Sequence, residues 1–176
     1  MTNRKAYQEG LPKKRMAAGC LFFDASGKLL IVKPTYKAGW EIPGGIIEKN
    51  ESPREACVRE VQEELGLAWG VGELLGVDYT SESDEYTESL QFIFLGDTLS
   101  EQNIVNIRLA EDELSEYRFV EPEQAVLWLN ERAGRRVEKC LKYREGGRIV
   151  YLENGNSNGN SNGDSNGNPN DGRGGR

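Results

Sequence analysis

The sequence contains no histidine among its 176 residues. A serine–histidine–aspartate triad, a cysteine–histidine pair and an imidazole zinc ligand are therefore all excluded within this chain. Acid–base chemistry near pH 7 must instead come from carboxylates, lysine, tyrosine or metal-bound water. This single absence removes many classes of enzyme at once.

Cysteines and long apolar runs are also scarce. The three cysteines, Cys20, Cys57 and Cys140, are scattered and form no C-x-x-C pair. This spacing favours free thiols in a reducing cytoplasm over a disulfide framework or a zinc site. No apolar run approaches the roughly 18–20 residues that span a bilayer, and no signal-peptide core follows the charged N-terminus. We therefore expect a cytoplasmic protein that does not bind a membrane.

Basic residues are outnumbered, with 22 Lys and Arg against 29 Asp and Glu, and the formal net charge is −7. Proteins that hold a nucleic-acid backbone by general electrostatics usually carry a basic face. We therefore expect no binding to a nucleic-acid backbone. The basic residues near the N-terminus are interpreted as a solvated arm: Arg4, Lys5, Lys13, Lys14 and Arg15.

The chain is long enough for one compact domain with a core, and its end has a different composition. From Asn154 to Arg176 there is no apolar side chain except Pro169, and Asn-Gly and Asn-Ser recur. Such a segment cannot bury enough surface to offset its ordering entropy. The sequence therefore predicts a folded domain over residues 1–153 and a flexible Asn/Gly/Ser-rich tail over residues 154–176.

Strand and helix patterns alternate within the predicted domain. Strands are predicted at Met16–Phe23, Leu29–Val32, Val71–Thr80, Leu90–Leu95, Tyr117–Val120 and Arg148–Leu152, with a short strand in Gly39–Gly45. Helices are predicted from Ser52 to about Leu65 and around Pro122–Glu131 and Val137–Lys142. Strands mixed with a few helices predict an α/β layered domain around a mixed sheet.

The helix that follows Ser52 has well-marked ends. Ser52 is a good N-cap, Pro53 suits the first turn, and Glu55 completes an S-x-x-E capping box. Gly66 suits the left-handed conformation that ends many helices. These local signals predict both ends of the helix.

One face of this helix is acidic. At about 100° per residue, Val61 and Leu65 lie with Val58 on an apolar side, the predicted core face. Glu60, Glu63 and Glu64 lie within roughly 100° of one another on another side. Like charges at i,i+4 destabilise a helix by a few tenths of a kcal/mol, so the cluster indicates a functional role. Taken alone, it also fits a solvated surface.

Clustered carboxylates are hard oxygen donors, which suit Mg²⁺ or Mn²⁺. The loop before the helix, Pro43-Gly44-Gly45, lets the backbone approach closely and exposes its carbonyl and amide groups. A glycine loop that leads into an acidic helix face can hold a metal ion between a backbone carbonyl and carboxylates.

The spacing of these residues resembles the Nudix box at every defined position, over Gly45–Leu67. Five residues separate Gly45 from Glu51, and seven more precede Arg59-Glu60-Val61, followed by Glu63-Glu64 and Gly66-Leu67. The Trp-Glu-Ile-Pro-Gly-Gly lead-in is also similar to Nudix hydrolases. The resemblance implies a Nudix hydrolase domain with an α/β/α sandwich fold around a mixed sheet.

The resemblance also implies an activity and roles for the residues that match. Family members hydrolyse a diphosphate bond in a nucleoside diphosphate linked to another group. Glu60, Glu63 and Glu64 would ligate Mg²⁺, with Mn²⁺ as a substitute, helped by a backbone carbonyl near Gly45. Glu51 and Arg59 would pair to fix the loop on the helix.

The general base stays open between two sets of carboxylates. One set is on the helix, at Glu63 and Glu64. The other is in the acidic loop Glu111–Glu116, where Glu113 and Glu116 are the candidates and a solvated turn is an equally good interpretation. In either case a divalent cation would bridge the like charges of substrate and carboxylates and activate the attacking water.

The substrate is not specified by the box. Trp40 or Tyr36, and Tyr86 or Phe92, are candidates for stacking on a base near Gly44, although core or rim packing explains such aromatics as well. A nucleoside triphosphate, normal or oxidised, and a nucleotide sugar such as ADP-ribose are equally favoured. We therefore expect a small-molecule nucleotide partner.

Two functions other than hydrolysis are compatible with a Nudix-like fold. The alternative to an enzyme is a non-catalytic Nudix-like sensor of nucleotide ligands, which would bind without turnover. An isomerase acting on isoprenoid diphosphates is disfavoured, because its chemistry is expected to use histidine ligands. Related enzymes are often dimers, so a homodimer is the expectation that the resemblance supports.

Overall fold

The computed structural model describes residues 4–84 and 86–157. Its strands are β1 (Arg15–Asp24), β2 (Leu29–Pro34), β3 (Gly44–Ile46), β4 (Leu74–Thr80), β5 (Ser89–Leu99), β6 (Leu114–Val120), β7 (Val150–Glu153) and β8 (Asn156–Ser157). Its helices are α1 (Arg4–Glu9), α2 (Pro53–Leu65), α3 (Glu101–Val105), α4 (Pro122–Trp128) and α5 (Glu131–Arg144).

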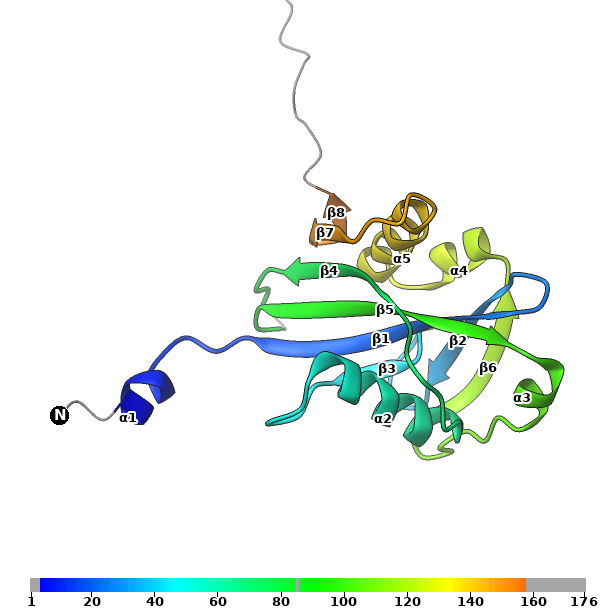
Figure 1. Ribbon diagram of the computed structural model, residues 1–176, viewed down its shortest axis with the longest axis horizontal. Coiled ribbons are helices and arrows are strands. Elements are labelled where there is room, and N and C mark those ends of the chain that lie inside the picture. Colours follow the sequence, from blue (N-terminus) through cyan, green and yellow to red (C-terminus); the bar gives the residue numbers. More distant parts are fainter. Residues whose placement is uncertain (1–3, 85, 158–176) are drawn as a thin grey trace, which may run out of the picture.

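The strands form one mixed sheet in the order β6-β2-β1-β5-β4-β7-β8, and β3 pairs with β1 beside this path. β1 runs parallel to β5, and β4 runs parallel to β7, whereas the other pairs are antiparallel. Helix α2 covers one face, and α4 and α5 cover the opposite face (Figure 1). The predicted α/β/α sandwich around a mixed sheet is confirmed.

Between its charged ends, Arg15 and Asp24, β1 is apolar, as expected for a strand in a sheet with helices on both faces. Cys20 and Phe22 point into the core on the α2 side, and Leu21 and Phe23 into the core on the α5 side. This alternation at period two makes β1 the centre of both cores. Within the described residues, no helix is long and apolar enough to cross a membrane.

Helix α2 begins and ends where its caps predict. The Ser52 hydroxyl accepts a hydrogen bond from the Glu55 backbone N–H (3.3 Å), and the Glu55 carboxylate accepts one from the Ser52 N–H (2.9 Å). Gly66 ends the helix in the left-handed conformation with φ 68°. A cap of this kind contributes on the order of 1 kcal/mol.

The buried face of α2 differs from the predicted one. Val58 is only half-buried, whereas Cys57, Val61 and Leu65 are fully buried against β1 and its neighbours. Glu64 belongs to this buried face and has 8% of its surface exposed. The acidic residues therefore do not share one solvated surface, because the helix turns one of them into the protein.

Several element boundaries also differ from prediction. The sequence predicts neither α1 nor α3, since helices of 6 and 5 residues without buried side chains show no apolar period. β4 begins at Leu74 rather than Val71. Helix α5 begins at Glu131, well before the predicted Val137, because the Asn130 side chain accepts a hydrogen bond from the Ala133 N–H (3.0 Å) and caps it.

The folded part extends past the predicted boundary at Glu153. β8 pairs with β7, and the Gly155 N–H donates to the Asp78 carboxylate (3.0 Å). Asp78 is completely buried and also binds Arg136 Nε (2.8 Å), so this carboxylate needs both partners. The start of the predicted tail is thus part of the domain. Residues 158–176 lie outside the described residues, so the rest of that prediction is not tested.

Truncation distinguishes the two boundaries. A chain that ends after Glu153 loses the N–H bound to buried Asp78, which costs roughly 1–3 kcal/mol. For a domain of this size that lowers the thermal midpoint by roughly 2–4 °C per kcal/mol. A chain that ends after Ser157 is the control and should match the full chain in differential scanning calorimetry. Equal midpoints for the two truncations would contradict a structural role for Asn154–Ser157.

Candidate active site

Two glycines let β3 lie close to both β1 and α2. Gly44 has φ 141°, and a Cβ there would overlap the carbonyl oxygen of Ala18 on β1. A Cβ at Gly45 would overlap the carboxylate of Glu60 on α2. The glycine loop therefore packs directly against one of the predicted metal ligands. At Gly44 the left-handed φ and the backbone of β1 exclude a side chain, whereas at Gly45 a Cβ would force the Glu60 carboxylate to move.

Glu64 is the buried carboxylate of the site. The Gly44 N–H donates a hydrogen bond to its Oε2 (2.8 Å). Burial raises the pKa of Glu64 to about 8; the Gly44 N–H opposes this rise, while the charges of Glu60, Glu113 and Glu41 add to it. Without a bound cation, this carboxyl is therefore largely protonated at neutral pH. A divalent cation can replace that proton and restore the anion.

Glu60 shares this environment. It is half-buried, and burial raises its pKa above the ordinary value. Arg59 lowers the pKa of Glu60, whereas the charges of Glu63 and Glu113 raise it. Several carboxylates thus lie close enough to oppose one another's ionisation. That is the condition under which a cation binds favourably.

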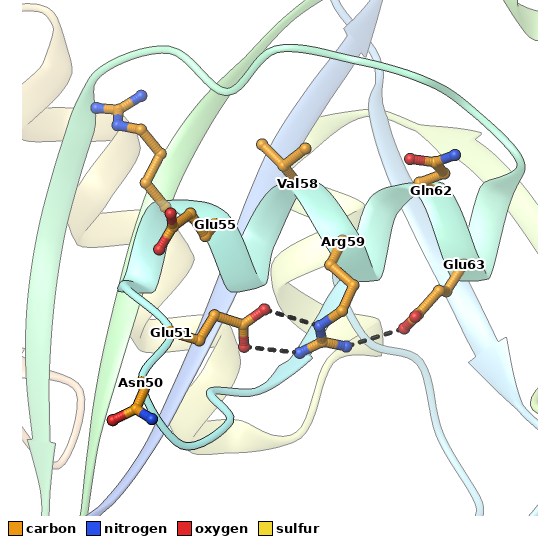
Figure 2. Close-up of a pocket in the computed structure, with 8 residues that line it drawn as sticks. Asn50, Glu51, Glu55, Val58, Arg59, Gln62 and Glu63 are labelled. Atoms are coloured by element: carbon orange, nitrogen blue, oxygen red, sulfur yellow. Dashed lines mark hydrogen bonds and ion pairs between the residues drawn. The ribbon is translucent and has the colours of Figure 1, made fainter.

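Arg59 is the cation that the protein itself supplies here. Its Nε and Nη2 bind the two oxygens of Glu51 (2.8 and 3.0 Å), as Figure 2 shows. Its Nη1 binds both Glu60 (2.8 Å) and Glu63 (2.9 Å). Glu51 holds the pKa of Arg59 above its ordinary value, and Arg59 holds that of Glu51 below. The structure therefore brings together the predicted loop–helix pair, Glu51 and Arg59.

The metal-ligand set needs a rearrangement before it can hold a cation. In the part of the chain that the structure describes, no three acidic or cysteine side chains are already in place around one metal position. Glu60 and Glu63 turn toward Arg59, and Glu64 turns toward Gly44. Their oxygens are nevertheless the donors that a hard divalent cation prefers, and the two bonds from Arg59 to Glu51 do not involve these three carboxylates.

The two candidate bases outside α2 lie in different surroundings. Glu113 is exposed, and its charge acts on both Glu60 and Glu64. Glu116 instead is bound by Arg118 Nε at 2.5 Å. The structure therefore brings Glu113 to the carboxylates of α2, whereas Glu116 has its own partner on β6.

Two of the predicted substrate-binding aromatics, Trp40 and Tyr86, have different surroundings. Trp40 stacks on Trp128 with ring centroids 5.6 Å apart, and the Arg118 guanidinium lies 5.2 Å from the Trp40 ring. Tyr86 is exposed and lies under Arg15, at 5.6 Å. Trp40 thus contacts neighbours of its own, whereas Tyr86 keeps about half of its surface exposed beside Arg15.

Glu41 is a residue of the site that the sequence analysis missed. Its charge raises the pKa of Glu64, and its carboxylate binds Lys37 Nζ at 2.6 Å. The signal that could have found it is its position in the Trp-Glu-Ile-Pro-Gly-Gly lead-in, immediately before the glycine loop.

An open depression of about 990 Å³ lies on the outer side of α2. Figure 2 shows Glu51, Arg59 and Glu63 on its wall, together with Val58. The more buried carboxylates, Glu60 and Glu64, do not line it. The depression therefore exposes the edge of the ligand set and not its centre.

Comparison with known proteins identifies the family. The NUDIX domain model matches residues 13–140, which is more than half of the chain. The chain belongs to the Nudix family. The resemblance drawn from the box is therefore confirmed, and the Nudix domain includes both the glycine loop and the acidic helix.

Curated relatives share part of this Nudix domain. Diphosphoinositol polyphosphate phosphohydrolase 3-alpha from Mus musculus is 42% identical over 66 residues, which is 37% of this chain and 40% of that protein. The human protein of the same name gives the same values. The match thus spans about 40% of the length of these relatives.

Solved structures extend the likeness to most of the fold. A MutT protein from Methanosarcina mazei Go1 aligns with a TM-score of 0.63 at 22% identity, covering 79% of this chain and 100% of that chain. A UDP-X diphosphatase aligns with a TM-score of 0.64 at 19% identity, covering 86% and 75%. At such low identities these likenesses establish a shared fold.

The raised pKa of Glu64 predicts a dependence of stability on pH. Between the ordinary carboxyl value of 4.5 and about 8, the folded protein keeps a proton that the unfolded chain has released. The free energy of unfolding in EDTA should therefore fall as pH rises through this range. Chemical denaturation between about pH 5 and pH 8.5 measures the slope.

Glu64→Gln is the control, because an amide cannot ionise. Its free energy of unfolding should depend less on pH than that of the wild type. Mg²⁺ should stabilise the wild type most at the upper end of the range, where the carboxylate is ionised. Identical pH slopes for the two proteins in EDTA would show that Glu64 is not the group responsible.

Proposed function

We propose that this Nudix protein is a divalent-metal-dependent pyrophosphohydrolase. It cleaves the diphosphate bond of a nucleoside diphosphate linked to another group. The observation that supports this most directly is the buried Glu64 beside Glu60 and the Gly44–Gly45 loop, inside an intact Nudix box. A buried carboxylate of raised pKa, held by a backbone N–H among other carboxylates, has little structural use without a cation.

Glu60, Glu63 and Glu64 would hold the cation, with Mg²⁺ as the natural ion and Mn²⁺ as a substitute. When bound there, a divalent cation supplies Lewis acidity and neutralises the charge between the carboxylates and a polyanionic substrate. Glu51 and Arg59 keep the loop fixed on α2 while Glu60 and Glu63 turn toward the cation. The pair that fixes the loop, Glu51 and Arg59, is thus distinct from the carboxylates that move, Glu60 and Glu63.

Glu113 is the favoured general base among the candidates. Its charge acts on Glu60 and Glu64, and its exposed position keeps it accessible to water. Glu116 lacks this freedom because Arg118 binds it. Glu63 and Glu64 are better assigned to the cation, which occupies the oxygens that a base would need.

Paired substitutions in the acidic loop and β6 test this assignment. Glu113→Gln should lower kcat by about 100-fold or more if its carboxylate accepts the proton of the attacking water. Glu116→Gln should change kcat little. Steady-state kinetics at saturating substrate and Mg²⁺, recorded against pH, measures both. A Glu113→Gln variant with an unchanged kcat and pH profile would return the role to a carboxylate of α2.

The substrate panel should include three kinds of diphosphate. Nucleoside triphosphates, normal and oxidised, and nucleotide sugars such as ADP-ribose contain the linkage that the Nudix box predicts. The curated relatives, which are diphosphoinositol polyphosphate phosphohydrolases, add a diphosphoinositol polyphosphate to the panel. All three are small, highly charged molecules, which agrees with a cation-dependent site.

The test of activity is release of phosphate or pyrophosphate from this panel, with Mg²⁺ and with EDTA. We expect turnover of one group in Mg²⁺, none in EDTA, and loss of most of it in Glu64→Gln at unchanged fold by circular dichroism. An unchanged kcat in Glu64→Gln at saturating Mg²⁺ would refute its role as a ligand. Thermal stabilisation by one compound without any turnover would instead favour a ligand sensor.

A further inference from the structure

The loop between β2 and β3 places a lysine next to the site. Lys37 Nζ lies 2.6 Å from Glu41 Oε1 and 5.2 Å from the centroid of the Tyr36 ring. Glu41 in turn is one of the charges that act on buried Glu64. A single ion pair therefore connects Lys37 to the carboxylates of the site.

Tyr86, from the segment between β4 and β5, also lies near Lys37. Partial burial lowers the pKa of Lys37, but Glu41 and, less strongly, the phenols of Tyr36 and Tyr86 hold it above its ordinary value. Arg15 at the start of β1 lies 5.6 Å from the Tyr86 ring centroid. We call Arg15, Tyr36, Lys37 and Tyr86 the rim cluster. It joins two cations and two exposed rings from three distant segments.

A polyanionic substrate needs positive charge beyond the cation on α2. Arg59 cannot supply it, because all three of its guanidinium nitrogens bind carboxylates. Lys37 can, since 44% of its side chain and 34% of that of its partner Glu41 are exposed to solvent. An ion pair this exposed contributes little to stability, so Lys37 can exchange Glu41 for another anion at small cost.

We propose that Lys37 breaks its ion pair with Glu41 when the substrate binds and donates hydrogen bonds from Nζ to a phosphate group adjacent to the scissile diphosphate. In this proposal Arg15 and Tyr86 lie on the opposite side of the phosphate from Lys37. The inference rests on the proposed function and narrows its substrate class. A substrate with at least three phosphates, such as a nucleoside triphosphate, uses the rim cluster, whereas the neutral sugar of ADP-ribose does not.

Steady-state kinetics of Lys37→Gln gives the first test. The KM for a nucleoside triphosphate should rise roughly tenfold or more, the loss expected for a hydrogen bond between charged groups, while kcat changes little. The KM for ADP-ribose should not change. Lys37→Arg should recover most of the affinity, because it keeps the charge.

Lys139→Gln is the matched control. Lys139 also pairs with a glutamate, Glu138 at 3.7 Å, but it lies on α5, across the sheet from α2. Its loss should leave every KM unchanged. If Lys37→Gln gives a triphosphate KM within about twofold of the wild-type value, Lys37 does not bind substrate.

Binding measured without turnover gives a second, independent test. The probes are imidodiphosphate and diimidotriphosphate, whose P–N–P bridges resist hydrolysis, each titrated with Mg²⁺ by calorimetry. The wild type should bind the longer probe more tightly, and Lys37→Gln should lose this preference while keeping its affinity for imidodiphosphate. An unchanged preference in Lys37→Gln would overturn the proposal.

The two tests separate the role of Lys37 from catalysis. If the wild type turns over a substrate and Lys37→Gln keeps the same preference for the longer probe, the proposed hydrolase activity stands and the role of Lys37 in binding is refuted. If the preference for the longer probe depends on Lys37 but no compound of the panel is hydrolysed, phosphate binding by Lys37 is supported and the hydrolase activity is refuted.

Discussion

The site depends on one arginine that holds mutually repulsive carboxylates in place. Arg59 binds Glu51 through two nitrogens and Glu60 and Glu63 through the third. Its Nη2 also donates to the carbonyl oxygen of Ile46 at the end of β3 (3.0 Å). A planar guanidinium can make these contacts simultaneously, and a lysine cannot. The same side chain therefore neutralises the acids and fastens the glycine loop to α2.

The same site contains a buried carboxylate, Glu64, at a position where an apolar side chain would be more stable. Glu64 occupies the buried face of α2 beside Leu65, and among the described residues its carboxylate accepts a hydrogen bond from the Gly44 N–H alone. The capping box and the apolar contacts of Val61 and Leu65 stabilise the helix enough to tolerate it. Such local conflicts between stability and sequence are expected at functional sites.

How far the sequence predicts this protein depends on whether a feature is local. The caps of α2 and the spacing of Glu51 and Arg59 are local, and the structure shows helix and pair where they were expected. The burial of Glu64 depends on β3 pairing with β1, which the helix alone cannot reveal. The order of residues 154–157 arises from the buried Asp78 on β4, although their composition is that of a flexible linker. Long-range contacts thus decided the two features that the sequence did not predict.

Arg59 and Lys37 differ in how firmly they are bound, and under the proposed function this difference would couple the cation to the substrate. Arg59 is fixed by Glu51, so carboxylates that turn toward a cation leave the frame intact. Lys37 is exposed and exchangeable. When it moves to a phosphate group, Glu41 loses its partner and its charge acts on the cation position beside Glu64 without compensation. If both proposals hold, substrate binding favours cation binding, and by linkage the cation favours the substrate to the same extent.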